Sequence, residues 1–134
     1  MSTTTATMTT QQVADRLVTL CRKGEFETAI KELYAPNVLS IEPEGGPGPT
    51  KVQCFDAVLK KSQDFGESME EVHSSVISDP GGTDDHFAVS MDMDMSMKGR
   101  GRNRMAELCV YQVKDGKIVK DQFFYPPMPM PSGN

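Results

Sequence analysis

Apolar residues recur at helical spacing in three stretches of the first half of the chain. The pattern predicts helices over residues 11–24 (QQVADRLVTLCRKG), 25–34 (EFETAIKELY) and 54–65 (CFDAVLKKSQDF). Thr10 is the expected N-cap of the first helix, because its side-chain oxygen can accept a backbone N–H, and Gly24 is its expected end. Pro36 is expected to end the second helix and Gly66 the third.

Beyond Gly66 the apolar residues follow a period of two. The clearest case is residues 86–98 (HFAVSMDMDMSMK), where Phe87, Val89 and four methionines alternate with polar residues. Further strands are predicted over residues 38–42 (VLSIE), 70–78 (EEVHSSVIS), 105–113 (MAELCVYQV) and 118–125 (IVKDQFFY). Glycine-containing turn signals separate the last four strands, and Asp115-Gly116 is the strongest of them.

The predicted order of elements is α-α-β-α-β-β-β-β. Helices come first and a meander of antiparallel strands comes last, which predicts an α+β fold. We expect residues 86–98 to form a central strand whose methionine row packs against the helices.

The chain has 134 residues, enough for one domain with a single core. We expect this domain to span residues 10–125, between a disordered Ser/Thr-rich tail (1–9) and a proline- and methionine-rich tail (126–134). A net charge of −5 argues against a nucleic-acid partner, and no apolar run is long enough to predict a membrane span. A signal-peptide pattern and a disulfide framework are both absent from the sequence, so a cytoplasmic location is expected.

Three segments together carry a resemblance to a known family. They are RLVTLCRKGEFETAIKELYAPN in the paired helices, Ile41-Glu42-Pro43 before a glycine-rich loop, and VYQVKDGKIVKDQFFY in the last hairpin. Over residues 11–125 the chain resembles the nuclear-transport-factor-2-like superfamily, in particular its SnoaL-like and ketosteroid-isomerase-like branch. The resemblance implies a cone-shaped, cystatin-like fold in which a curved antiparallel sheet wraps around the N-terminal helices. It also implies an apolar pocket at the open end of the cone and a homodimer.

Glu42 is the first candidate for chemistry. Ketosteroid isomerases have a catalytic acidic residue followed by proline at the matching place, so the resemblance implies that Glu42 is a general base at the pocket mouth. Those isomerases also use a tyrosine on the first helix and a protonated aspartate on the penultimate strand. Here Leu17 and Val18 lie near the first position and Cys109 near the second, so isomerisation by that mechanism is not expected. The alternative interpretation of Glu42 is a solvated acid at a strand end.

Two more acids and two tyrosines share strand faces that the resemblance turns towards the pocket. Glu107 and Tyr111 are four residues apart on one strand, and Asp121 and Tyr125 are four apart on its hairpin neighbour. We predict that these four groups and Glu42 surround one cavity, in which at least one carboxyl group has a raised pKa. The expected catalytic residues are Glu42, Glu107 and Asp121, and the expected ligand-binding residues are Met91, Met93, Met95, Cys109, Tyr111, Phe123 and Tyr125. Alternatively, Glu107 and Asp121 are solvated or paired across strands.

The other polar groups have simpler interpretations. Asp92 and Asp94 alternate with methionines, which favours a solvated outer face over a metal site. The basic stretch 98–104 (KGRGRNR) has no interleaved aromatic residues, which favours a solvated hairpin tip over a nucleic-acid site. Cys109 has apolar neighbours and is expected to be an inert buried thiol. The sequence contains no nucleotide- or metal-binding motif, so no cofactor is expected.

The outer face of the predicted sheet is too apolar for a fully solvated surface. It carries Leu108, Val110, Gln112 and Phe124. We therefore expect a homodimer built on this face. Asp92 and Asp94 lie on the same face and are expected to ring the interface or to pair with Arg100 or Arg102 of the partner subunit.

Two function classes follow from these features. The first is a protein that binds a small apolar molecule and uses pocket carboxyl groups without a cofactor, as an isomerase, hydrolase or cyclase does. The second is a non-catalytic module that carries a ligand or associates with other proteins. The fold hosts both classes, so the site must decide between them.

Overall fold

The computed structural model of the chain describes residues 7–44 and 49–126. Its helices are α1 (Thr10–Arg22), α2 (Phe26–Leu33) and α3 (Phe55–Ser68). Its strands are β1 (Tyr34–Ile41), β2 (Lys51–Gln53), β3 (Met69–Ile77), β4 (Gly81–Gly82), β5 (His86–Met97), β6 (Gly101–Lys114) and β7 (Lys117–Phe124). Most of the predicted N-terminal tail (1–6), part of the glycine-rich loop (45–48) and most of the C-terminal tail (127–134) lie outside the described residues. Within the described ranges, no helix is both long and apolar enough to cross a bilayer.

The start of α1 differs from the sequence prediction. Thr9 rather than Thr10 is the N-cap: its hydroxyl accepts the Gln12 N–H at 3.1 Å, and its own N–H donates to the Gln12 side chain at 2.9 Å. This capping box satisfies two backbone N–H groups at once, which one threonine hydroxyl cannot do. The Thr10 hydroxyl instead donates to the Asp84 carbonyl oxygen at 2.6 Å. Met8, just before this cap, packs against the core.

The end of α2 also differs from the prediction. The helix ends at Leu33, and Pro36 lies inside β1 rather than ending the helix. The register of β1 with its neighbour β7 shifts between Tyr34 and Leu39, so Pro36 lies in an irregular stretch where the missing N–H costs no ladder bond. The third helix likewise runs past Gly66 to Ser68. Strands β2 and β4 were not predicted, because three and two residues are too few to show a period.

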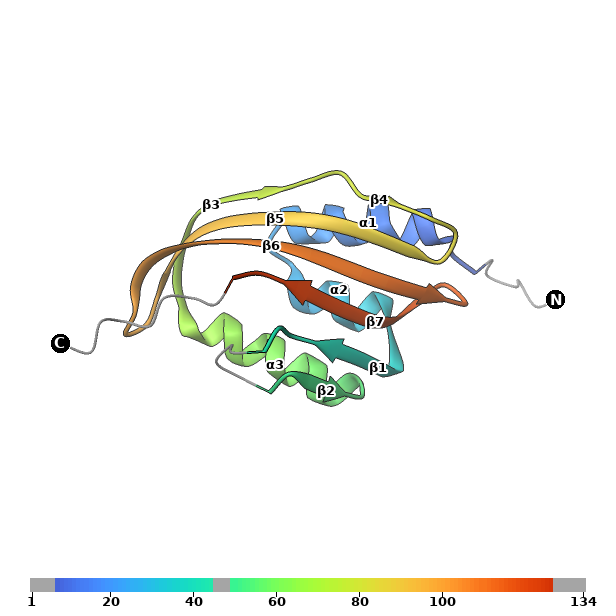
Figure 1. The fold of residues 1–134 in the computed structure, drawn as a ribbon, viewed down its shortest axis with the longest axis horizontal. Coiled ribbons are helices and arrows are strands. Elements are labelled where there is room, and N and C mark those ends of the chain that lie inside the picture. Colours follow the sequence, from blue (N-terminus) through green and yellow to red (C-terminus); the bar gives the residue numbers. More distant parts are fainter. Residues whose placement is uncertain (1–6, 45–48, 127–134) are drawn as a thin grey trace.

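The strands form one sheet in the order β2-β1-β7-β6-β5-β3, and β4 also pairs with β5. The predicted antiparallel meander is present in β5, β6 and β7, whereas β1 pairs with β7 in parallel. Figure 1 shows the long strands β5 and β6 bending along an unclosed sheet, with α1, α2 and α3 on one side of it. The predicted α+β class and the curved sheet are therefore confirmed.

Strand β5 lies inside the sheet, with β6 on one side and β3 and β4 on the other. Its alternating pattern is also its burial pattern: Phe87, Val89 and the four methionines are buried, and the residues between them are not. Burying such a row removes about 2 kcal/mol of unfavourable hydration per large side chain. Phe87, Val89 and Met91 of this row belong to one core cluster with residues of all three helices, so this half of the row anchors the sheet to the helices.

The outer face of β5 and β6 corrects one expectation about charge pairing. Arg102 forms a two-pronged ion pair with Asp94, at 2.9 and 2.8 Å, and Arg104 pairs with Asp92 in the same way. These acids are thus satisfied within one subunit. The predicted turn at residues 99–103 is shorter in the structure, since β6 already begins at Gly101.

The predicted hairpin turn between β6 and β7 is present. Asp115 and Gly116 both have positive φ, at 52° and 75°, which matches the right-handed twist of the two strands. A side chain at Gly116 would come within 2.7 Å of Thr7, so glycine also allows the N-terminal segment to lie against this turn.

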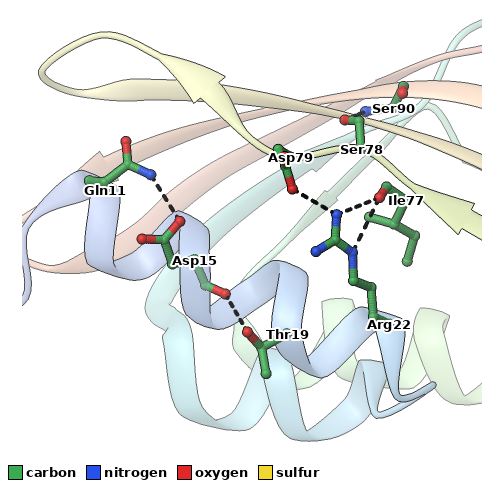
Figure 2. A network of polar contacts seen from close by, with 8 residues as sticks. All are labelled: Gln11, Asp15, Thr19, Arg22, Ile77, Ser78, Asp79 and Ser90. Atoms are coloured by element: carbon green, nitrogen blue, oxygen red, sulfur yellow. Dashed lines mark hydrogen bonds and ion pairs between the residues drawn. The ribbon is translucent and has the colours of Figure 1, made fainter.

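Helix α1 is tied to the end of β3 through one arginine. Figure 2 shows the Arg22 guanidinium donating to the Ile77 carbonyl oxygen, at 3.2 and 2.8 Å, and pairing with Asp79 at 2.9 Å. Beside it, the Ser90 N–H of β5 donates to the Ser78 hydroxyl at 2.9 Å. These contacts hold α1 at a set position over the sheet.

Candidate functional site

A cavity of about 520 Å³ lies between the helices and the inner face of the sheet. All three helices contribute to its wall, as do β5, β6 and β7. Its apolar lining includes Leu17, Phe26, Ile30, Val58, Phe65, Met91, Met93, Met105 and Phe123. The volume is typical of a site for a small organic molecule, and the lining is typical of one that binds by apolar contact.

One polar cluster at the cavity joins α3 to β1 and to the end of β7. The Lys61 ammonium donates to Glu42 Oε1 at 3.0 Å and to the Ser40 hydroxyl at 2.6 Å. The Tyr125 hydroxyl donates to the other Glu42 oxygen at 2.7 Å. Both Glu42 oxygens thus have a donor, and the carboxylate has a cationic partner. The Lys61 ammonium also lies 5.2 Å from the centre of the Phe123 ring.

A second carboxyl group, Asp121, lies deeper in the same wall and is only 2% exposed. The Tyr34 hydroxyl donates to Asp121 Oδ2 at 2.5 Å, while Oδ1 has no hydrogen-bond partner among the described residues. Burial raises the pKa of Asp121, and the Ser40 and Tyr34 hydroxyls and the Lys61 charge only partly oppose that rise. Ser40 is its register neighbour on β1, so this carboxyl group adjoins the Lys61 cluster.

The third carboxyl group, Glu107, has the weakest polar support of the three. The only hydrogen bond that it receives from the described residues is from the Cys109 thiol, at 3.6 Å. Burial raises the pKa of Glu107 from 4.5 to about 7; the nearby Glu42 and Asp121 carboxyl groups add to the rise, and Cys109 and Lys61 oppose it. Glu107 therefore exchanges its proton near neutral pH, as an acid–base catalyst must.

The tyrosines at the cavity are proton donors that do not ionise. Tyr111 stacks on Phe87 with ring centres 4.7 Å apart and stands opposite Asp121 in the β6–β7 ladder. Burial raises the pKa of Tyr34, Tyr111 and Tyr125 above the ordinary value for tyrosine. Each of these hydroxyls therefore keeps its proton and can donate a hydrogen bond.

Most of the residues proposed from the sequence line this one cavity. They are Glu42, Met91, Met93, Glu107, Tyr111, Asp121, Phe123 and Tyr125. Cys109 and Met95 point to the same side of the sheet, but they are fully buried and do not reach the lining. The burial of Cys109 raises the pKa of its thiol, which suits the inert role predicted for it.

Sequence reasoning missed Lys61, Ser40 and Tyr34. Lys61 follows Val58 by three residues and so falls on the buried face of α3, which is the one signal that could have found it. Tyr34 and Ser40 both lie on β1; Tyr34 had been predicted as the last residue of a helix, and Ser40 lay in the predicted strand 38–42 without a role. No group of three His, Cys, Asp or Glu side chains that could hold a metal ion occurs in the described ranges.

Comparison with known proteins agrees with this architecture. A crystal structure of a candidate SnoaL-like polyketide cyclase from Mesorhizobium loti is 31% identical to the chain, with a TM-score of 0.82, and the match covers 88% of this chain and 100% of that one. A protein of unknown function with a cystatin-like fold from Xanthomonas campestris is 18% identical, with a TM-score of 0.75, over 88% of this chain and 91% of that one. A candidate isomerase from Bacillus subtilis is 15% identical, with a TM-score of 0.68, over 87% of this chain and 85% of that one.

The last two similarities show the fold alone, because their identities are low. A search of the curated proteins found no match. The sequence pattern of the SnoaL-like domain, however, matches residues 8–125, which is nearly the whole described chain. The chain therefore belongs to the SnoaL-like domain family of the nuclear-transport-factor-2-like superfamily, as the sequence resemblance implied.

Proposed function

We propose that the cavity binds a small apolar molecule and that Glu107 moves a proton on it without a cofactor. The observation that carries this proposal is the state of Glu107. It is a carboxyl group on an apolar cavity wall, it has no strong donor among the described residues, and burial brings its pKa to about 7. A carboxyl group in this state lowers the stability of the folded protein at neutral pH. A role in proton transfer explains why such a group lies in the cavity wall.

The other two carboxyl groups are better suited to positioning. Each Glu42 oxygen already accepts a hydrogen bond, and Lys61 neutralises the carboxylate charge. Glu42 would have to give up one of these contacts before it could accept a proton from a ligand. Asp121 is held by Tyr34 in the floor of the cavity. Tyr111 also lines the cavity, and its hydroxyl is the proposed donor to a ligand oxygen that becomes negative.

The reaction class we propose is proton transfer at a carbon next to a carbonyl group. The Glu107 carboxylate takes a proton from that carbon, the bonding electrons move to the carbonyl oxygen, and the proton returns to the same or another carbon. The relative described as a candidate SnoaL-like polyketide cyclase supports this class. Where the resemblance puts the oxyanion donors of the ketosteroid isomerases, this chain has Leu17 and Val18 near the first position and Cys109 near the second, so the proposed donors differ from theirs.

The first experiment measures proton exchange directly. The bicyclic ketone 2-tetralone is incubated with the protein in D2O, and NMR follows the replacement of its α-protons by deuterium. We expect acceleration over buffer, and Glu107→Gln should remove at least about a hundredfold of it. Glu70→Gln, at an exposed position on β3, is the matched control and should keep the wild-type rate. Equal rates for Glu107→Gln and wild type would overturn the role of Glu107.

A second measurement separates catalysis from carriage. In protein labelled at the methionine methyl groups, bound 2-tetralone should shift the signals of Met91, Met93 and Met105, which line the cavity. The signal of Met95, which is fully buried outside the lining, is the internal control. Binding without exchange would favour the second function, a non-catalytic carrier. Absence of both shifts and exchange would contradict the proposal.

The proposed assembly is a homodimer through the outer face of the sheet. Leu108 and Phe124 are 44% and 48% exposed, and Val76 on β3, which stands opposite the outer-face residue Asp92, is exposed as well. Exposed apolar side chains gathered on one sheet face are typical of an interface between subunits. The ion pairs of Asp92 and Asp94 within the subunit leave these acids at the rim without an unpaired charge.

A further inference from the structure

The charges around the cavity have mostly one sign. Five acids line it: Glu25, Glu27, Glu42, Glu107 and Asp121. Among the described lining residues Lys61 is the one basic side chain, and it is already paired with Glu42. A low-dielectric cavity rimmed by charges of one sign concentrates the opposite charge.

From this arrangement we infer that the ligand of the cavity is an apolar amine bound as its cation, with the ammonium group beside Glu107. The inference rests on the proposed function and narrows its substrate to apolar amines that also carry the carbonyl group on which that reaction acts. It excludes carboxylates and phosphates, because an anion would find no unpaired basic side chain among the described lining residues. It also predicts that neutral alcohols and ketones of the same shape bind more weakly than the amine.

The charged and titratable groups around Glu107 come from several elements. They are Lys61 on α3, Cys21 on α1, Glu42 after β1, Asp121 on β7, Tyr125 after β7 and Cys109 on the strand of Glu107 itself. No lysine, arginine or histidine among the described residues forms an ion pair with Glu107 or Asp121. Glu107 and Asp121 therefore both lack an ion-pair partner, and the buried Asp121 Oδ1 has no hydrogen-bond partner in the described part of the chain. A ligand cation beside Glu107 supplies the counter-ion that this wall lacks.

The aromatic side chains of the wall suit a cation as well. Phe26, Phe65, Tyr111, Phe123 and Tyr125 line the cavity, and the face of an aromatic ring attracts a positive charge. The Lys61 ammonium already lies 5.2 Å from the centre of the Phe123 ring, so this wall accommodates a cation over an aromatic face. The apolar remainder of the wall takes the hydrocarbon part of the ligand.

Binding of a cation, unlike binding of a neutral ligand, should release protons from the site. An ammonium group beside Glu107 favours the carboxylate, so the amine drives Glu107 to release its proton. Since burial sets the pKa of Glu107 near 7, about half a proton per site should be released at pH 7. The carboxylate formed in this way is the proton acceptor that the proposed reaction needs.

The test compares three ligands of one shape: 2-aminotetralin, 2-tetralol and tetralin-2-carboxylate. Isothermal titration calorimetry measures their affinities at pH 7 in phosphate and in Tris, whose different ionisation enthalpies report proton release. We expect the amine to bind at least about tenfold more tightly than the alcohol, and the carboxylate at least about tenfold more weakly. Glu107→Gln should reduce the preference for the amine to below about threefold and abolish the proton release. Glu70→Gln should leave the preference unchanged.

The outcomes separate this inference from the function on which it rests. If the alcohol binds at least as tightly as the amine, or the carboxylate binds best, the inference is overturned and the apolar cavity site stands. A preference for the amine that survives in Glu107→Gln also overturns the assignment to Glu107. If none of the three ligands binds or shifts the Met91 and Met93 signals, both the inference and the proposed function fail.

Discussion

Replacing Glu107 by glutamine tests whether the cavity really makes this carboxyl group unfavourable when charged. The unfolded chain ionises Glu107 at its ordinary pKa of 4.5, whereas burial raises the pKa in the folded state to about 7. A difference of this size corresponds to about 3 kcal/mol between the two protonation states. The favourable contribution of the neutral acid is fully present below pH 4.5 and is lost as the pH rises through 7.

The assay is urea denaturation of wild type and Glu107→Gln at several pH values. Glutamine keeps the shape of the neutral acid and cannot ionise. The free energy of unfolding of the variant, relative to that of the wild type, should therefore rise by about 2 kcal/mol between about pH 5.5 and pH 8. Glu70→Gln changes an exposed residue, so the difference in unfolding free energy between this variant and the wild type should stay constant over the same pH range. A difference between Glu107→Gln and wild type that does not change with pH would refute the burial argument.

Three further predictions concern the fold and the assembly. Met93→Asp should abolish the cooperative thermal transition, because it buries a charge without a partner, whereas Met93→Leu should lose less than about 1.5 kcal/mol; a soluble, cooperatively melting Met93→Asp would refute the placement of β5. Thr9→Ala should lower the free energy of unfolding by about 1 kcal/mol in urea denaturation, and an unchanged value would contradict the capping box. Sedimentation at tens of micromolar protein should give a dimer that Leu108→Lys converts to a monomer; a monomeric wild type counts against the outer-face interface.

The candidate site could be predicted where it depends on strand parity. Glu107 and Tyr111 lie on one face of β6, and Asp121 and Tyr125 follow the same parity along β7, because side chains alternate along a strand. This parity is local, so the sequence contains it. The methionine row of β5 was readable for the same reason. The Asp115-Gly116 turn pairs Val113 with Ile118, and a register shift between Gln112 and Val113, which no sequence pattern showed, then brings Tyr111 opposite Asp121.

The parts that the sequence did not reveal depend on contacts between distant segments. Lys61 resembles any solvated lysine on a helix until α3 packs over β1 and brings its ammonium to Glu42. The parallel pairing of β1 with β7 joins the two ends of the domain, and no local pattern reports it. Pro36 was misread because a proline near a helix end usually ends it, whereas here the helix had already ended at Leu33.

The measurement that tests the central claim most directly is a carbon-detected NMR titration of the side-chain carboxyl groups, with Glu107→Gln to assign the Glu107 signal. We predict that Glu107 titrates with a pKa near 7, and that this transition is missing in the variant. If Glu107 and Asp121 both titrate near the values of free carboxyl groups, about 4, the cavity does not hold a proton-transfer group. The chain would then be better described as a binding module.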